Sequence, residues 1–386
     1  GTLKQVKEEE VREEEVLTER DKTAAEIFVT DILTEAYKME VSDIHIESFR
    51  KSKRLRYRMD GILVDQKKRA QEIEERYLAV VSILKLLSGA RIEEKRLPQD
   101  GAIAFNNGEI EFDLRVSFLP VQGGFERVVM RILRKDAISL SFDDLGLDKK
   151  DYKSIREATG ATQGLILVTG PTGSGKTTTL YSILSELNDD KTNIMTAEDP
   201  VEYELEGISQ SQMKNEINFT FASALRTFLR QDPEVILVGE IRDQETGTIA
   251  VEAALTGHLV LSTLHTSSAV KTIDRIIDVF PPSQKSQIRS MLSESLLAVV
   301  AQKLLQNKSG SGRVPACEVM VANSAIRNLI REDKIYQIPS IIQAGSQEGM
   351  QSLDQDLQRL VGQGLVSRGD AAKIADNAEL FEGAFF

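Results

Sequence analysis

The stretch LILVTGPTGSGKTTTLYSIL, residues 165–184, decides the fold of the larger part of this 386-residue chain. It begins as an apolar run typical of a buried strand, continues as a glycine-rich turn and opens a helix. The turn, Gly170 to Thr177, matches the pattern G-x-x-x-x-G-K-[ST] in the context that this pattern requires. Glycines let such a loop point its backbone N–H groups toward phosphate oxygens, so the sequence predicts a nucleotide site. The expected nucleotide-binding residues are Gly170, Pro171, Thr172, Gly173, Ser174, Gly175, Lys176, Thr177 and Thr178.

The residues of this loop indicate ATP and Mg²⁺ as the cofactors. The Lys176 ammonium would reach the β- and γ-phosphates, and the Thr177 hydroxyl would ligate magnesium. The site also needs carboxylates, and two strand-like runs supply them. PEVILVGEIRD places Glu240 just after a buried run, at the strand end where open α/β sheets bind ligands. NIMTAEDPVEY offers Glu198, Asp199 and Glu202 in the same way.

The segment from Gly164 to about Gln302 alternates short β-rich runs with helical segments. This alternation is typical of a parallel sheet with crossover helices, so we expect a mostly parallel α/β fold. A helix is expected to carry Ala301–Leu304 (AQKL), with a flexible loop at 307–313 and polar helical stretches after it.

A smaller α/β domain is expected before this one. KRLRYRMDGILV alternates Arg54, Arg56 and Arg58 with apolar residues and then turns at Asp60-Gly61, so one strand face is cationic and the other belongs to a core. A second strand pair follows in EIEFDLRVSFLP and FERVVMRIL. The expected divisions are residues 1–22 for a charged linker or N-terminal helix, 23–137 for the small domain, 138–150 for the connection and 151–386 for the large domain with its helical C-terminal part.

Composition narrows the function. Lysine and arginine number 48 and aspartate and glutamate 60, which gives a net charge of −12 and argues against general polyanion binding. The single cysteine, Cys317, suits a reducing compartment. No apolar run is long enough to span a bilayer and the charged N-terminus is not a signal peptide, so any membrane role is expected to come through partners. His45, His258 and His265 lack the cysteines or paired spacing of a zinc site, so no zinc is expected.

Several motifs occur in an order that resembles the secretion ATPases that drive type II secretion and type IV pilus assembly or retraction. They are the P-loop, AEDPVEY (198–203 with the preceding alanine), ALRTFLRQDPEVILVGEIRD (224–243), TGHLVLSTLHT (256–266) and, in the small domain, SDIHIE (42–47), RYRMDG (56–61), LPQDG (97–101) and ERVVMRIL (126–133). The resemblance extends from about Thr23 to the C-terminus. It implies a hexameric ring of subunits, each with a PAS-like small domain and a RecA-like motor, that converts ATP hydrolysis into mechanical work.

The resemblance also implies roles for particular residues. Glu202 would be the catalytic carboxylate that orients or deprotonates the attacking water, and Glu240 would hold the magnesium shell. Spacing alone does not decide between Glu198 and Glu202, and the resemblance favours Glu202. His258 and His265 match a histidine box read as a nucleotide sensor or interface contact. Arginines matching those that reach nucleotide are Arg115 and either Arg127 or Arg131 in the small domain, and Arg226, Arg230 and Arg242 in the motor.

The load of the motor stays open at this point. The tail Ala325 to Val366 resembles retraction motors, whereas SDIHIE resembles assembly motors. The four-cysteine zinc module of many assembly-type relatives is replaced by NKSGSGR. Whether the further N-terminal domain that many assembly motors possess precedes the acidic segment is left open. The expected partners are copies of the chain and an inner-membrane platform protein, with the motor cytoplasmic and peripheral at that membrane. A nucleic-acid translocase is disfavoured by the net charge and the absence of tryptophan, and a nucleotide-binding regulator without turnover is a further alternative.

Overall fold

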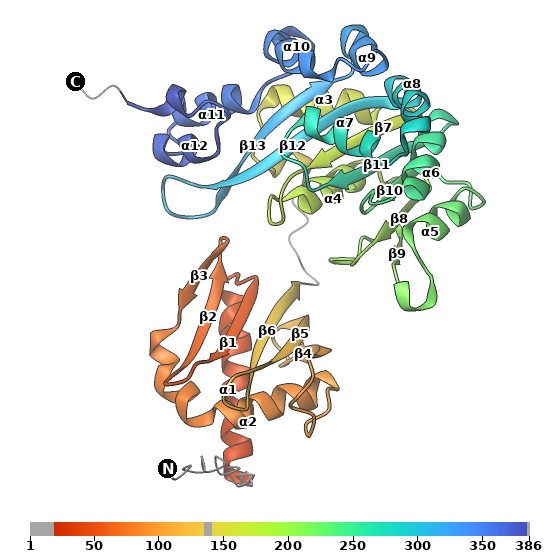
Figure 1. Ribbon diagram of the computed structural model, residues 1–386. Coiled ribbons are helices and arrows are strands. Elements are labelled where there is room, and N and C mark those ends of the chain that lie inside the picture. The colour runs from red at the N-terminus through yellow and green to blue at the C-terminus, as the bar shows by residue number, and fades with distance from the viewer. Residues whose placement is uncertain (1–18, 135–140, 384–386) are drawn as a thin grey trace, which may run out of the picture. The chain divides into compact units, whose positions relative to one another are not determined.

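The computed structural model describes residues 19–134 and 141–383, which fall into two compact units, 1–135 and 136–386 (Figure 1). Most of the expected charged segment 1–22 and the first part of the expected connection 138–150 lie outside the described residues. Among the residues that are described, no helix has both the length and the apolar character needed to cross a bilayer.

The small unit is an antiparallel sheet in the order β3-β2-β1-β6-β5-β4, with two helices packed on one face (Figure 1). As the alternation predicted, Leu55 and Tyr57 are buried in its core, and the arginines that alternate with them, Arg54, Arg56 and Arg58, lie on the other face. The β2–β3 turn places Asp60 and Gly61 at φ +49° and +81°, which suits a tight hairpin. The elements are α1 (Glu19–Lys38), β1 (Asp43–Ser48), β2 (Lys53–Met59), β3 (Ile62–Asp65), η1 (Lys67–Arg69), α2 (Ala70–Ser88), β4 (Gln99–Asn106), β5 (Glu111–Val121) and β6 (Phe125–Arg134).

The large unit is built on a seven-stranded sheet in the order β13-β12-β7-β11-β10-β8-β9. Every neighbouring pair is parallel except β12 and β13, which confirms the predicted, mostly parallel α/β class. Its first elements are η2 (Phe142–Asp144), α3 (Lys149–Thr159), β7 (Gly164–Thr169), α4 (Lys176–Leu187), β8 (Ile194–Glu198), β9 (Ser209–Gln212), η3 (Asn215–Ile217), α5 (Phe221–Phe228), β10 (Val235–Val238), α6 (Gln244–Leu255) and β11 (Leu259–Leu264). Its remaining elements are α7 (Ala269–Asp278), η4 (Pro282–Gln284), α8 (Lys285–Ser295), β12 (Leu296–Gln306), β13 (Arg313–Val321), α9 (Ser324–Arg331), η5 (Ile335–Gln337), α10 (Ile338–Ala344), η6 (Ser346–Glu348), α11 (Leu353–Gly362), α12 (Arg368–Ile374) and η7 (Ala378–Phe381).

The central strand β7 feeds two hydrophobic cores because successive side chains point to opposite faces of the sheet. Leu165 and Leu167 pack into the core shared with α5 to α8, whereas Ile166 and Val168 pack into the core shared with α3 and α4. All four are at most 1% exposed. The end of β7, where the P-loop begins, is therefore fixed from both sides.

The predicted helix at Ala301–Leu304 is wrong, because these residues belong to β12. β12 lies between β7 and β13 and is covered on both faces, so its apolar run, LLAVVAQKLLQ, has no period-two alternation to identify it as a strand. The polar loop after it turns back through Gly310 and Gly312 into β13, a strand that the sequence analysis did not anticipate.

Candidate nucleotide site

The candidate site lies where the parallel strands of the large unit end. In register, Thr169 of β7 pairs with Leu264 of β11, and Val238 of β10 pairs with Ala197 of β8. The residues that follow these positions, and the P-loop itself, therefore share one edge of the sheet. Because the P-loop leads directly into α4, it also presents the positive end of a helix dipole to an anion.

The P-loop backbone has the turns that its glycines predict. Gly173 and Gly175 adopt φ angles of +80° and +81°, in the left-handed region that favours glycine. The N–H group of Ser174 donates to the carbonyl of Pro171 at 3.1 Å, which closes the first bend. These turns and this hydrogen bond give the loop the tight curl of a phosphate-binding turn.

Lys176 is linked to two residues that the sequence analysis placed at the site. Its Nζ donates to the Gly170 carbonyl at 2.9 Å and lies 2.7 Å from Nδ1 of His265. On the other side of the ring, Nε2 of His265 lies 3.6 Å from Oε1 of Glu240. Burial lowers the pKa of Lys176, and the nearby Glu240 carboxylate opposes that shift. A charged Lys176 requires Nδ1 of His265 to accept, so this ring bridges the ammonium and the carboxylate.

Glu240 follows β10 and its side chain is 18% exposed, so its carboxylate is largely screened from water. Its Oε2 accepts a hydrogen bond from Nε of Arg242 at 2.6 Å. The structure therefore brings together four predicted residues, Lys176, Glu240, Arg242 and His265, from the ends of three strands. Together they offer an ammonium, a guanidinium and a carboxylate, the groups expected around a magnesium–phosphate ligand.

Glu198 and Glu202 have different surroundings. Glu198 is 5% exposed and its carboxylate accepts from the Tyr181 hydroxyl, from Thr196 Oγ1 at 2.6 Å and from Gln210 Nε2 at 3.2 Å. Glu202 is only partly buried, and its backbone N–H donates to the same Tyr181 hydroxyl at 3.2 Å. Three protein donors enclose Glu198, whereas Glu202 sits on a loop whose backbone is tied to α4.

The other predicted residues of the large unit lie in different places. His258 comes just before β11, and its Nδ1 lies 3.0 Å from the Ala253 carbonyl. The six residues of β11 separate it from His265 by roughly 20 Å, so the two histidines are at opposite ends of the strand. Arg226 pairs with Glu245, and Arg230 donates to the Arg226 carbonyl at 3.1 Å. These contacts keep both arginines on the surface formed by α5 and α6.

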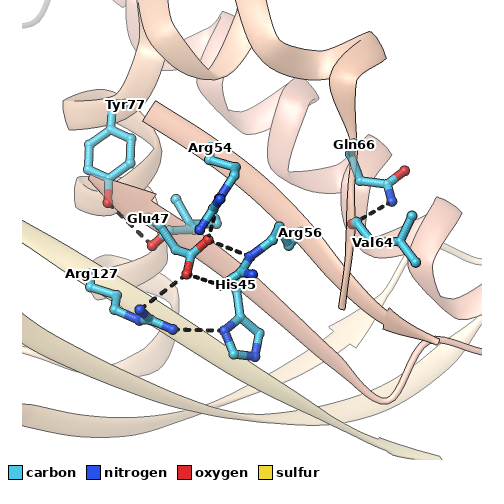
Figure 2. Close-up of polar contacts among 9 residues, drawn as sticks. His45, Glu47, Arg54, Arg56, Val64, Gln66, Tyr77 and Arg127 are labelled. Carbon is cyan, nitrogen blue, oxygen red and sulfur yellow. Dashed lines mark hydrogen bonds and ion pairs between the residues drawn. The ribbon is translucent and has the colours of Figure 1, made fainter. Parts of the chain in front are cut away.

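In the small unit, a buried carboxylate gathers three arginines (Figure 2). Glu47 is 1% exposed, accepts hydrogen bonds from Arg54 Nε at 2.9 Å and Arg56 Nη2 at 2.6 Å, and forms an ion pair with Arg127 Nη1 at 3.1 Å. Nη2 of Arg127 also lies 3.0 Å from Nδ1 of His45. Although burial favours the neutral acid, hydrogen bonds from Arg56 and Arg54 hold the pKa of Glu47 below its ordinary value. The cluster keeps a surplus of positive charge on this face of the sheet.

The two other predicted arginines of this unit lie further along the same sheet. Nε of Arg131 pairs with Asp43 at 3.0 Å, and Arg115 of β5 lies opposite Arg131 in register. Sequence reasoning missed Asp43 and Glu47 as anchors. A signal was present, because Asp43, His45 and Glu47 alternate along β1 in step with the arginines of β2.

Sequence reasoning also missed two residues that support the site in the large unit. Tyr181 of α4 joins Glu198 to the Glu202 backbone, and Gln302 of β12 contacts the P-loop. Neither belongs to a local pattern. Their contact partners are up to 128 residues away along the chain, so only the folded structure identifies them.

Comparisons with known proteins match both units. A family model described as type II/IV secretion system protein matches residues 18–374. Type II secretion system protein E of Pseudomonas aeruginosa is 47% identical over 300 residues, which are 77% of this chain and 58% of that protein. The HxcR protein of the same organism, also a type II secretion system protein, is 40% identical over 373 residues, covering 91% and 77%. A crystal structure of the pilus retraction motor PilT with bound ADP is 36% identical with a TM-score of 0.68, covering 91% and 98%. The chain thus spans little more than half the length of the first of these relatives.

Proposed function

The chain belongs to the type II/IV secretion system protein family, and on this premise we propose that it is a magnesium-dependent ATP hydrolase that works as a motor. The observation that carries the proposal is the Lys176–His265–Glu240 chain of contacts at the P-loop. It supports a site in which a lysine and a carboxylate from different strands meet at the place where a phosphate would bind. Thr177, at the start of α4, and Glu240 supply the hard oxygen donors that magnesium prefers.

In the proposed mechanism the P-loop residues 170–178 bind ATP, and Lys176 neutralises phosphate charge that grows in the transition state. Magnesium, when bound, further neutralises the phosphates. Glu202 orients the attacking water, and its partial exposure supports this role over that of Glu198, whose carboxylate is occupied by three protein donors. Arg242 and His265 complete the phosphate environment. Arg115, Arg127, Arg131, Arg226 and Arg230 are proposed to join it in the assembled motor.

We further propose that the motor is a homohexamer of subunits divided at 23–137, 138–150 and 151–386. It is cytoplasmic, peripheral at the inner membrane, and acts on an inner-membrane platform protein. Its work is assembly of a type II secretion pseudopilus or a type IV pilus, which the similarity to type II secretion proteins supports. Pilus retraction is the second candidate, supported by the similarity to a retraction motor.

The ATPase proposal is tested on the purified, assembled full chain. Lys176→Ala, Glu240→Gln and Glu202→Gln are each expected to lower turnover at least about 100-fold, because each removes charge stabilisation or water positioning. Glu252→Gln, an exposed carboxylate on α6, is the control and should leave turnover unchanged. Absence of turnover in the assembled wild type would refute the ATPase proposal. Because several arginines are proposed to join the site only in the assembled motor, turnover per subunit should fall when dilution dissociates it, and a constant value would refute that part of the proposal.

The load is tested by counting surface pili after deletion of the gene. Loss of pili supports assembly, and excess pili support retraction. An unchanged count with impaired protein export supports secretion. An unchanged count with normal export would contradict all three.

A further inference from the structure

Gln302 lies beside the P-loop, at the point where β12 passes the end of β7. The parallel register ends at Ala301 and Thr169, so Gln302 is the next residue on its strand just as Gly170 is on the neighbouring one. It is 4% exposed. A buried primary amide at this position needs partners for both of its ends.

The amide of Gln302 has those partners on the two sides of the motif. Its Nε2 donates to the Ser174 carbonyl at 2.9 Å. Its Oε1 accepts from the Thr179 hydroxyl, in the first turns of α4, at 2.7 Å. The donor contact reaches a carbonyl and the acceptor contact reaches a hydroxyl, so the orientation of the amide is determined by its surroundings. One side chain therefore joins the P-loop to the helix that follows it.

The donor contact determines the direction of one peptide group. In a trans peptide the C=O of one residue and the N–H of the next point in opposite directions. By holding the Ser174 carbonyl toward β12, Gln302 turns the Gly175 N–H away from β12. That direction is the one required of an N–H group that meets phosphate at the start of α4.

Both glycines that define the motif pack against the same residue. A Cβ at Gly170 would lie 2.4 Å from the Gln302 carbonyl oxygen, and a Cβ at Gly175 would lie 2.9 Å from Gln302 Nε2. Both distances are closer than real Cβ atoms approach their neighbours. The glycines thus serve close packing on β12 as well as backbone freedom.

We propose that Gln302 is a positioning residue that sets the Ser174–Gly175 peptide of the P-loop for phosphate binding. The inference rests on the proposed nucleotide-binding function. The two hydrogen bonds of the amide have different roles. Donation to the Ser174 carbonyl orients the loop and should matter for nucleotide binding, whereas acceptance from Thr179 stabilises the contact with the helix.

The test compares four variants of the full chain by calorimetric titration with MgADP. Gln302→Leu removes both contacts, Gln302→Glu replaces the donor with a carboxylate oxygen and so also adds a negative charge, and Thr179→Val removes only the hydroxyl. Gln351→Leu is the matched control, because Gln351 is also a buried amide, 5% exposed, with donor contacts to Asp151 and to the Cys317 carbonyl. Gln302→Leu and Gln302→Glu are expected to weaken MgADP binding about tenfold, and Thr179→Val and Gln351→Leu less than about threefold.

A second readout needs no nucleotide. Amide hydrogen exchange of segment 170–177 in the free protein is expected to accelerate in both Gln302 variants and to be unchanged in Gln351→Leu. The inference is overturned if Gln302→Glu binds MgADP as the wild type does, or if Gln351→Leu weakens binding as much at equal loss of melting temperature. If the wild type binds no MgADP, the proposed function fails, and unchanged exchange in Gln302→Glu then overturns the positioning role separately.

Discussion

Removing one oxygen atom from Tyr181 tests whether the loop of Glu202 is held for catalysis. The ring is 1% exposed and packs edge-on against Tyr203, with ring centroids 4.8 Å apart, so Tyr181→Phe keeps the packing. The lost hydroxyl donates to Glu198 and accepts from the Glu202 N–H at 3.2 Å. Burial and the neighbouring Glu198 raise the pKa of Tyr181, so this hydroxyl stays protonated as a donor across the physiological range.

The size of the effect follows from these two bonds. Loss of a hydrogen bond to a charged carboxylate is expected to lower the free energy of unfolding by about 1.5–3 kcal/mol. Loss of the bond that holds the Glu202 backbone, about 1 kcal/mol, is expected to reduce kcat about five- to tenfold. KM for ATP is expected to be unchanged, because Tyr181 has no part in the Lys176 contacts at the P-loop.

Steady-state ATPase kinetics and urea unfolding of the same preparation measure the two effects. Tyr203→Phe is the control, because it removes the same atom from the neighbouring ring without touching the hydroxyl of Tyr181, and its kcat should stay within about twofold of the wild type. A normal kcat in Tyr181→Phe, alongside the expected loss of stability, would show that this bond does not position the proposed catalytic carboxylate, Glu202.

Three further predictions concern charge. Raising the pH from 8 toward 10 is expected to weaken MgADP binding. Burial lowers the pKa of Lys176 in the free protein, whereas bound phosphate raises it, so the complex holds more protons than the free protein. Titration calorimetry should show that MgADP affinity depends less steeply on pH in Lys176→Arg, and an equal dependence would refute the role given to Lys176. Burial raises the pKa of Asp151 to about 8, so the native state holds a proton that the unfolded state releases. As the pH rises from the ordinary aspartate pKa to 8, the free energy of unfolding should therefore fall by at most about 1.4 kcal/mol per pH unit. Denaturant titrations should show this slope reduced in Asp151→Asn, and an undiminished slope contradicts the prediction. Lys85→Met removes the buried ion-pair partner of Glu126, 2.7 Å away, and should lower the free energy of unfolding by about 3–5 kcal/mol. Adding Glu126→Leu should restore most of the lost stability in thermal melts. No recovery in the double variant would contradict the ion-pair explanation.

The P-loop could be predicted from sequence because everything that defines it is local. The strand, the glycine turn and Lys176 lie within twenty residues, and each leaves its own pattern. Glu240 was equally predictable, since it follows a short buried apolar run that identifies the end of a strand. The fold class followed from the alternation of runs, for the same reason.

Features that depend on distant pairing could not be predicted. β12 reads as a helix because its cover on both faces removes the alternation that marks a strand, and this cover comes from elements elsewhere in the chain. His258 and His265 look equivalent in sequence, but the strand between them separates them in space. The enclosure of Glu198 depends on Tyr181 and Gln210, and no spacing rule connects the three.

Glu47 pairs with three guanidinium groups, so its arginine partners are redundant with one another. If any one arginine is removed, the other two still compensate the buried negative charge. Alanine scanning one position at a time would therefore report small losses at Arg54, Arg56 and Arg127 and would undervalue all of them. The strength of the cluster would appear only when two are replaced together, as a loss larger than the sum of the single ones.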